Sequence, residues 1–389
     1  MRRKSRERGV YEGMPTETKP AVEEQPEKIT HKDLKPWQRK RLLSFAIPVI
    51  LLFSMYLGVT ATVLYKDRTA EDESWYATTT TDADVMADVE KISANATEVT
   101  VGTYVEDLKD ISLKNSSYAA VVLVWFRWEG DETLDMLNSF HVYRGTIANR
   151  EIMKNLHKDG MNYQLMRFTT TVSKNFWTRR FPLESHQLRF YIESDHPADT
   201  VRFVADKKDS GINPSLSFNG YELKRHLVNE YYIRYANNHG DPEYTGKVIT
   251  PELVTAIEIG RNSFGLYAKC FIALVGTIGW ILITLYINTY HRVDPLGMIP
   301  GALFGTVSNI MVGANLLPDA LQMGLLEYVN IFGIMMILTA ALSIINVNFI
   351  RNKYSDRAFA QLFGRTMFGI LLGFTIFGNV LLPVISYLA

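Results

Sequence analysis

The stretch FIALVGTIGWILITLYINTY, Phe271–Tyr290, contains no charged residue and decides the broad class of this chain. A helix needs roughly 18–20 apolar residues to cross the hydrocarbon core of a membrane, and this stretch is long enough. Runs of comparable length and apolar character occur at Leu42–Tyr65, Leu296–Leu317, Leu325–Ile350 and Thr366–Leu388. We therefore predict an integral membrane protein with five transmembrane helices.

The distribution of basic residues predicts the orientation of the chain. They are concentrated before the first apolar run, in segments 2–8 and 35–41, and basic residues close to a span favour the cytoplasmic side. We expect a cytoplasmic N-terminus, a large periplasmic or extracellular domain after the first span, and a C-terminus on that same outer side. Arg351, Lys353 and Arg357 then fall in the cytoplasm, as the rule requires.

The first apolar run has two interpretations. It could be a cleaved signal peptide, with Thr60-Ala61-Thr62 as a poor cleavage site. However, a signal core has about 7–15 apolar residues, whereas Leu42–Tyr65 is longer and follows a long polar leader. These features favour a retained transmembrane anchor, preceded by a disordered cytoplasmic tail over residues 1–41.

Composition narrows the class of protein further. The 41 basic and 41 acidic residues give no net charge, so the balance does not favour nucleic acid as a partner. Cys270 is the only cysteine and lies at the start of a span, so the outer domain must fold without a disulfide. This pattern suits a protein of the bacterial inner membrane.

The segment between the first two spans reads as β-structure. Side chains alternate in Gln187–Glu193 and Val201–Val204, while Ala119–Trp128 is almost entirely apolar, as in a strand buried on both faces. We predict a β-sandwich over residues 97–262, joined to the N-terminal anchor at 42–65 by a connector at 66–96. A four-helix transmembrane bundle that forms the pore domain follows over residues 263–389.

Several motifs occur in an order and spacing typical of one membrane protein family. They are VTVGTYV at 99–105, Tyr118–Trp128 followed by Asp131 and Leu134, FPLESHQL at 181–188, Ile257–Arg261, Asn315–Pro318 and Asn346-Val347-Asn348. Together they resemble the pentameric ligand-gated ion channels, in prokaryotic form without the flanking cysteines. Glu184 and His186 stand where that family has aspartate and glutamine. The resemblance covers about 97–389 and implies a homopentamer that conducts ions when an external ligand binds, with the N-terminal helix as an addition.

The run Leu296–Leu317 has one face that could line a pore. The candidate residues are Asp294, Gly297, Gly301, Phe304, Ser308, Met311 and Asn315. The last six follow i, i+4, i+7, i+11, i+14 and i+18, which is one face of a helix, and the resemblance selects the same face. Phe304 could form an apolar constriction that closes the path by dewetting. Alternatively, the glycines four residues apart serve close helix packing and the face is sealed.

Asp294 precedes Pro295, which is a favourable first residue for a helix. Five such carboxylates in a ring would attract cations, and the dipole of the helix would keep them ionised. Asp294 could also simply cap the helix, and the two roles are compatible. We predict a cation-permeable pore.

The resemblance implies that Glu184 and Arg261 pair where the outer domain rests on the helices, with Asp110 as a third member. Such an ion pair would let movement of the outer domain bias the pore. The alternative is an ordinary interfacial salt bridge that only joins the two domains.

The resemblance also implies a ligand pocket between neighbouring subunits, lined with aromatic side chains. The candidates are Trp128, Tyr231, Tyr232 and Tyr235. An aromatic cage of this kind would suit an ammonium compound through cation–π attraction. The alternative is that these side chains are ordinary packing residues.

No enzyme motif is present in the sequence. We expect no enzymatic activity, no cofactor and no metal site. Two functions stay open: an externally gated, cation-permeable channel, and a non-conducting envelope receptor or scaffold. The expected partners are further copies of the chain, inorganic cations, an unknown small-molecule ligand and membrane lipid.

Overall fold

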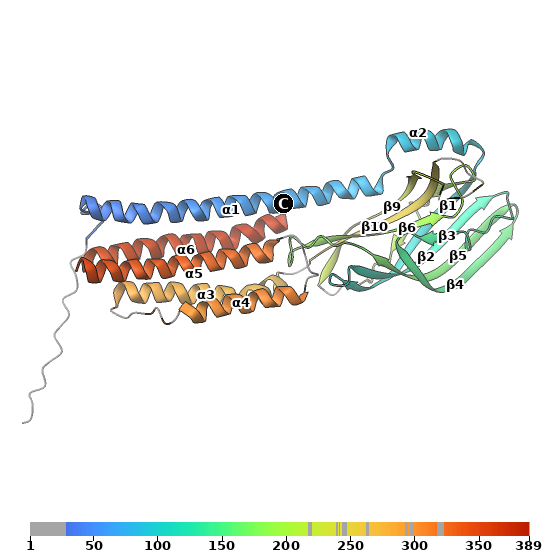
Figure 1. Ribbon diagram of the computed structural model, residues 1–389. Helices are drawn as coiled ribbons and strands as arrows, with labels where there is room; N and C mark the ends of the chain where they lie inside the picture. Colours follow the sequence, from blue (N-terminus) through green and yellow to red (C-terminus); the bar gives the residue numbers. More distant parts are fainter. Residues whose placement is uncertain are drawn as a thin grey trace, which may run out of the picture.

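The computed structural model describes residues 29–216, 220–238, 240, 242, 247–261, 264–291, 295, 297, 299–316 and 323–388. The side chains of residues 308–310, 312–316 and 388 lie outside this description. Within it, the long helices form an elongated layer at one end of the molecule, and the strands form two sheets at the other, with the short helix α2 beside them (Figure 1).

The helices begin with a long N-terminal one. They are α1 Pro36–Thr79, α2 Ala83–Ile92, the short 3-10 helix η1 Ser93–Asn95, α3 Gly265–Tyr290, α4 Ile299–Leu316, α5 Leu325–Lys353 and α6 Arg357–Leu388. In the layer, α1 packs against α6 and α5, while α4 packs against α3 and α5. Figure 1 accordingly shows α1 and α4 on opposite sides of the layer.

The strands form one mixed sheet and one antiparallel sheet. They are β1 Thr97–Ser112, β2 Ser117–Glu129, β3 Phe140–Val142, β4 Gly145–Lys158, β5 Met161–Ser173, β6 Ser185–Ser194, β7 Val201–Ala205, β8 Gly211–Ile212, β9 Tyr221–Tyr235 and β10 Val248–Arg261. The first sheet has the order β4-β5-β2-β1-β7, with β8 also paired to β1, and the second has the order β3-β6-β10-β9. Both β7 and β8 run parallel to β1.

The two sheets bury a shared apolar core. Val101 and Phe126 of the first sheet belong to the same buried cluster as Phe190 and Leu253 of the second. Burial of this apolar surface is the main force that holds the sheets together.

The helices share a second apolar core, which the N-terminal helix helps to form. Phe53 of α1 is fully buried, and its ring centroid lies 5.7 Å from that of Phe332 in α5 and 5.3 Å from that of Phe374 in α6. The first apolar run is thus an integral part of the helical layer.

The fold class predicted from the sequence was wrong in the arrangement of its elements. A sandwich is shown only in part, because β7 and β8 join the first sheet in parallel, and alternation of side chains carries no information on strand direction. The helix that contains the predicted anchor does not end at residue 65 but continues to Thr79, through part of the predicted connector. A polar segment can extend a helix as readily as an apolar one, so the change in hydropathy did not mark its end.

Four helices of the described chain are long and apolar enough to cross a membrane, which supports a membrane protein. They are α1, α3, α5 and α6. The expected number of five is therefore not reached within the described residues, where three such helices follow the sheets in place of the predicted four.

Candidate functional site

The sheets meet the helices at a junction built by the ends of β6 and β10 (Figure 1). The two strands are antiparallel neighbours with Gly260 opposite Ser185. Arg261, the last residue of β10, therefore lies beside Glu184, which precedes β6. The Nη2 atom of Arg261 is 2.9 Å from Oε1 of Glu184, and its Nε donates to the same oxygen at 3.0 Å. The two residues are in contact, and their part in coupling stays a prediction.

The Glu184 carboxyl is held in one position by several neighbours. The Tyr221 hydroxyl donates to Oε1 of Glu184 at 3.1 Å, and the Arg261 guanidinium lies 3.9 Å from the centre of the Tyr221 ring. Burial disfavours the charge of Glu184, but the neighbouring His186 and Arg261 outweigh burial and lower the pKa of this carboxyl. Hydrogen bonds to a charged group are strong and directional, so this pair holds the end of β10 firmly against the residue that precedes β6.

Asp110, the expected third member of the junction, is not part of this pair. It is exposed in β1 and has a positive φ of 51°. Within the described chain no ion pair joins it to Glu184 or Arg261.

The junction includes acidic residues of α1 that the sequence analysis did not identify. Asp67 Oδ1 accepts a hydrogen bond from Arg179 Nη1 at 2.9 Å, and Glu71 is bonded to Arg180. The Ser185 hydroxyl lies within hydrogen-bonding distance of the Glu71 carboxyl, at 3.1 Å. A signal existed in the sequence, since Asp67 and Glu71 continue at helical spacing from the apolar positions of the anchor.

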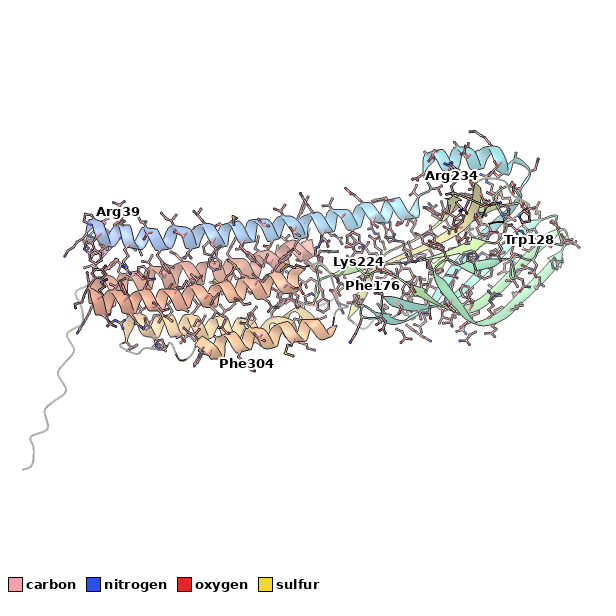
Figure 2. All side chains as sticks on the ribbon, in the orientation of Figure 1. Arg39, Trp128, Phe176, Lys224, Arg234 and Phe304 are labelled. Atoms are coloured by element: carbon pink, nitrogen blue, oxygen red, sulfur yellow. The ribbon has the colours of Figure 1, made fainter. Side chains whose placement is uncertain are left out.

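The predicted pore face lies on α4, on the side of the helical layer away from α1 (Figure 1). Phe304 is 74% exposed and Met311 is 65% exposed, whereas Ala302 and Thr306 of the same helix are buried. The Phe304 side chain points away from the other helices in Figure 2. Gly301 is also exposed, and Gly297 lies just before the first residue of α4.

Three of the predicted pore residues cannot be placed in full. Asp294 lies outside the described residues, and Ser308 and Asn315 belong to α4 but their side chains are outside the description. Of the predicted pore residues, Gly297, Gly301, Phe304 and Met311 are therefore the ones that the structure places in full.

The glycines of this region differ in their surroundings. A Cβ atom at Gly305 would lie 2.5 Å from the Thr277 hydroxyl of α3, so this glycine permits close packing of the two helices. A Cβ atom at Gly297 or Gly301 would meet nothing within 4 Å. Packing within the chain therefore explains Gly305 but neither Gly297 nor Gly301.

A second candidate site is an acidic cavity of about 510 Å³ between the end of β6 and the β9–β10 hairpin. Its wall includes His141, Glu193, Asp195 and Tyr235. The Tyr235 hydroxyl donates to Glu193 at 2.7 Å, while the two ring nitrogens of His141 lie 3.2 Å from Glu193 and 2.8 Å from Asp195. The hydrogen bond to Glu193, opposed by burial and supported by Asp195, raises the pKa of His141 to about 9.

The four predicted aromatic residues do not form one cage within the chain. Tyr235 lines the acidic cavity. Tyr231 packs against Tyr191, with ring centroids 5.7 Å apart, and Tyr232 is buried with its hydroxyl donating to the Phe203 carbonyl. Trp128 is a buried core residue at the far end of the sheets (Figure 2). The sequence analysis did not identify Glu193 and Asp195 as cavity residues. Alternation of polar and apolar residues identifies strands, but it does not show which polar residues of neighbouring strands lie together.

No protein-family model and no curated protein sequence matches this chain. The resemblance to pentameric ligand-gated ion channels therefore rests on the motifs quoted above.

Proposed function

We propose that this protein is a pentameric, ligand-gated, cation-permeable channel related to the pentameric ligand-gated ion channels. It acts in the bacterial inner membrane, with its sheets in the periplasm or outside the cell. The competing function is a non-conducting envelope receptor or scaffold.

The observation that carries the proposal is the exposed face of α4. Large apolar side chains such as Phe304 and Met311 alternate there with glycines, and packing within the chain does not account for Gly297 and Gly301. α4 lies on the side of the layer opposite α1. In a ring of copies, α1 faces the lipid and the α4 helices surround the axis. The Phe304 side chains then form an apolar constriction.

The ends of the helices support the proposed orientation. Gln38 of α1 donates to Asp356, which precedes α6, so the start of α1, the end of α5 and the start of α6 lie together. The basic residues Arg39, Lys40, Arg41, Arg351, Lys353 and Arg357 all belong to this end of the layer. Positive charge favours the cytoplasmic side of a membrane.

The acidic cavity supports a cationic ligand. Glu193 and Asp195 supply two carboxyl groups, which share the single imidazole of His141, and Tyr235 lines the same cavity. Carboxylates and aromatic rings are the groups that bind organic ammonium ions. We use choline as the probe of this ligand class.

The experiment combines assembly with conduction. Native mass spectrometry of the detergent-solubilised protein is expected to give a five-subunit particle. In proteoliposomes, Phe304→Ala is expected to raise resting potassium flux several-fold, because the apolar constriction widens and becomes wet. Ile272→Ala is the matched control, since Ile272 of α3 is 73% exposed but lies outside the proposed path.

Two results would contradict the proposal. A stable dimer would rule out the ring. A five-subunit particle that passes no potassium, either as wild type or as Phe304→Ala, would favour the receptor or scaffold.

A further inference from the structure

The N-terminal helix uses one face along its whole length, from the membrane to the sheets. Its buried residues are Gln38, Leu42, Ala46, Val49, Phe53, Leu57, Thr60, Leu64, Asp67, Glu71, Trp75 and Thr79. They recur every three or four residues, as one stripe of a helix requires. At 1.5 Å per residue, the 44 residues of α1 extend about 66 Å. A single rigid element therefore connects the far end of the helical layer with the sheets (Figure 1).

The helix is fixed at its far end by specific contacts. The Gln38 amide donates to Asp356 at 2.7 Å, and Arg41 donates to Asn346 of α5 at 3.0 Å. The Trp37 ring lies 4.9 Å from the Tyr354 ring. These contacts hold the start of α1 to the end of α5 and the start of α6.

At the junction the same stripe becomes acidic. Asp67 and Glu71 are buried, and they pair with Arg179 and Arg180 of the segment between β5 and β6. Arg180 is itself buried and also donates to the Ser386 carbonyl of α6 at 3.4 Å. Removal of one partner would leave a charge buried without compensation, so these pairs are costly to break.

The segment between β5 and β6 also bonds through its backbone to α5 and to the end of β10. The Arg179 carbonyl accepts a hydrogen bond from the Leu325 amide, the first residue of α5, at 2.7 Å. The Glu184 carbonyl accepts one from the Arg261 amide at 3.3 Å. Asp67 and Glu71 thus hold a segment whose backbone bonds both to the start of α5 and to Arg261, the last residue of β10.

We propose that Asp67 and Glu71 of α1 are positioning residues for gating. They hold Arg179 and Arg180 so that the segment between β5 and β6 stays seated on the start of α5 and beside Arg261. The gating role rests on the proposed channel function, whereas the positioning role does not.

Amide hydrogen exchange tests the positioning role on the full-length wild-type protein in detergent. Glu71→Gln removes one of the two carboxylates that pair with Arg180, the other being Asp67. We expect about tenfold faster exchange at Leu325 and Arg261, equivalent to about 1.4 kcal/mol. Both amides are remote in sequence from the substitution, and a purely local anchor would leave them unchanged. Glu73→Gln is the matched control, because Glu73 is exposed on the opposite face of the same helix.

A second variant keeps the test decisive if Glu71→Gln fails to fold. Asp67→Asn weakens the same clamp through Arg179 and is expected to give the same pattern of exchange. If exchange at Leu325 is unchanged in both variants while assembly is intact, the inference is wrong, irrespective of the potassium flux that the variants show.

The gating role is measured as the choline concentration that gives half-maximal potassium flux. Glu71→Gln is expected to raise this concentration by about 5-fold to 150-fold, the usual range of coupling between sites, while Glu73→Gln leaves it unchanged. The exchanged pair Glu71→Arg with Arg180→Glu is expected to restore part of the response. A normal response in Glu71→Gln overturns the gating role alone. A wild type that choline does not open counts against the proposed function, and the exchange result then decides the inference.

Discussion

Glu193 of β6 and Glu252 of β10 lie opposite each other in the ladder of the second sheet, and both are buried. Two carboxyl groups this close cannot both carry charge without a large cost. Burial, together with the charge of Glu193, raises the pKa of Glu252 to about 8. Glu252 therefore keeps its proton at neutral pH, while His141 on the other side of Glu193 carries a positive charge.

The pair predicts how stability depends on pH. Since the pKa of Glu252 is about 8 against 4.5 for an ordinary glutamate, the folded state holds an extra proton between these pH values. The stabilisation is complete below about pH 4.5 and is lost as pH rises through 8, at up to about 1.4 kcal/mol per pH unit. Glu252→Gln is expected to flatten the fall in melting temperature between pH 6 and 8, measured by thermal unfolding in detergent.

The melting temperature of Glu252→Gln is still expected to fall somewhat as pH rises, because His141 also loses its proton. Its raised pKa means that its own contribution is present below about pH 6.5 and is lost as pH rises through about 9. Glu90→Gln, at an exposed position of α2, is the control and is expected to keep the wild-type slope. A Glu252→Gln protein with that same slope would show that the buried pair is not protonated as described.

At the scale of residues, a contact was predicted correctly from the sequence only where both residues belong to a recognised motif. Glu184 and Arg261 were named from the resemblance, and the structure brings them together. Asp67 and Glu71 were missed because charged residues after an apolar run were interpreted as a connector. Their helical spacing from Leu57 and Leu64 indicates that they lie on the same buried face of the helix. The prediction relied on the change in hydropathy and overlooked this spacing.

At the scale of elements, stretches predicted as strands lie inside observed strands, but the predicted arrangement of the fold was wrong and four helices of the described chain, not five, are long and apolar enough to cross a membrane. The stretches Ala119–Trp128 and Gln187–Glu193 lie inside β2 and β6. The parallel pairing of β7 with β1 could not be predicted, because it depends on contacts between strands far apart in the chain. Hydropathy likewise placed a boundary inside α1.

The helices pack closely enough that a single glycine determines how two of them meet. A Cβ atom at Gly378 of α6 would lie 2.5 Å from the Phe332 ring of α5, which itself contacts Phe53 of α1. Gly378→Ala is expected to displace Phe332 and to cost about 1–3 kcal/mol, as overpacking of a core does. Thermal unfolding in detergent measures the loss.

The same helix provides the control for this variant. A Cβ atom at Gly373 would meet nothing within 4 Å, and alanine is a better helix former than glycine. Gly373→Ala is therefore expected to leave the melting temperature unchanged or to raise it. Equal melting temperatures for the two variants would show that α5 and α6 are not packed as closely as described.

At the scale of the whole molecule, α1 and α4 form opposite sides of the helical layer. α1 presents large apolar side chains outward, such as Leu51, Met55 and Val59. α4 presents glycines together with Phe304 and Met311. A side rich in large apolar side chains suits lipid, whereas a side with several glycines suits the axis of a ring.

Charge selection is a property of the assembled ring, and it is predicted from the sequence alone because Asp294 lies outside the described residues. Asp294 is the only acidic residue between Arg292 and Pro318. α3 ends at Tyr290 and α4 begins at Ile299, and these two helix termini point toward the end of the layer away from the sheets (Figure 1). Five copies would form the main fixed charge that an ion meets from the cytoplasm.

Substitution of this residue is expected to change which ions pass. Asp294→Asn should shift the reversal potential under a salt gradient toward zero, and Asp294→Lys should shift it toward the value for anions, because the sign of the ring decides which ion is concentrated there. The difference should shrink in high salt, since the screening length is already about 8 Å at 0.15 M. Planar-bilayer recordings on the wild type and both variants measure it. A wild-type channel that prefers chloride, or an Asp294→Lys channel with the wild-type reversal potential, would place ion selection elsewhere in the path.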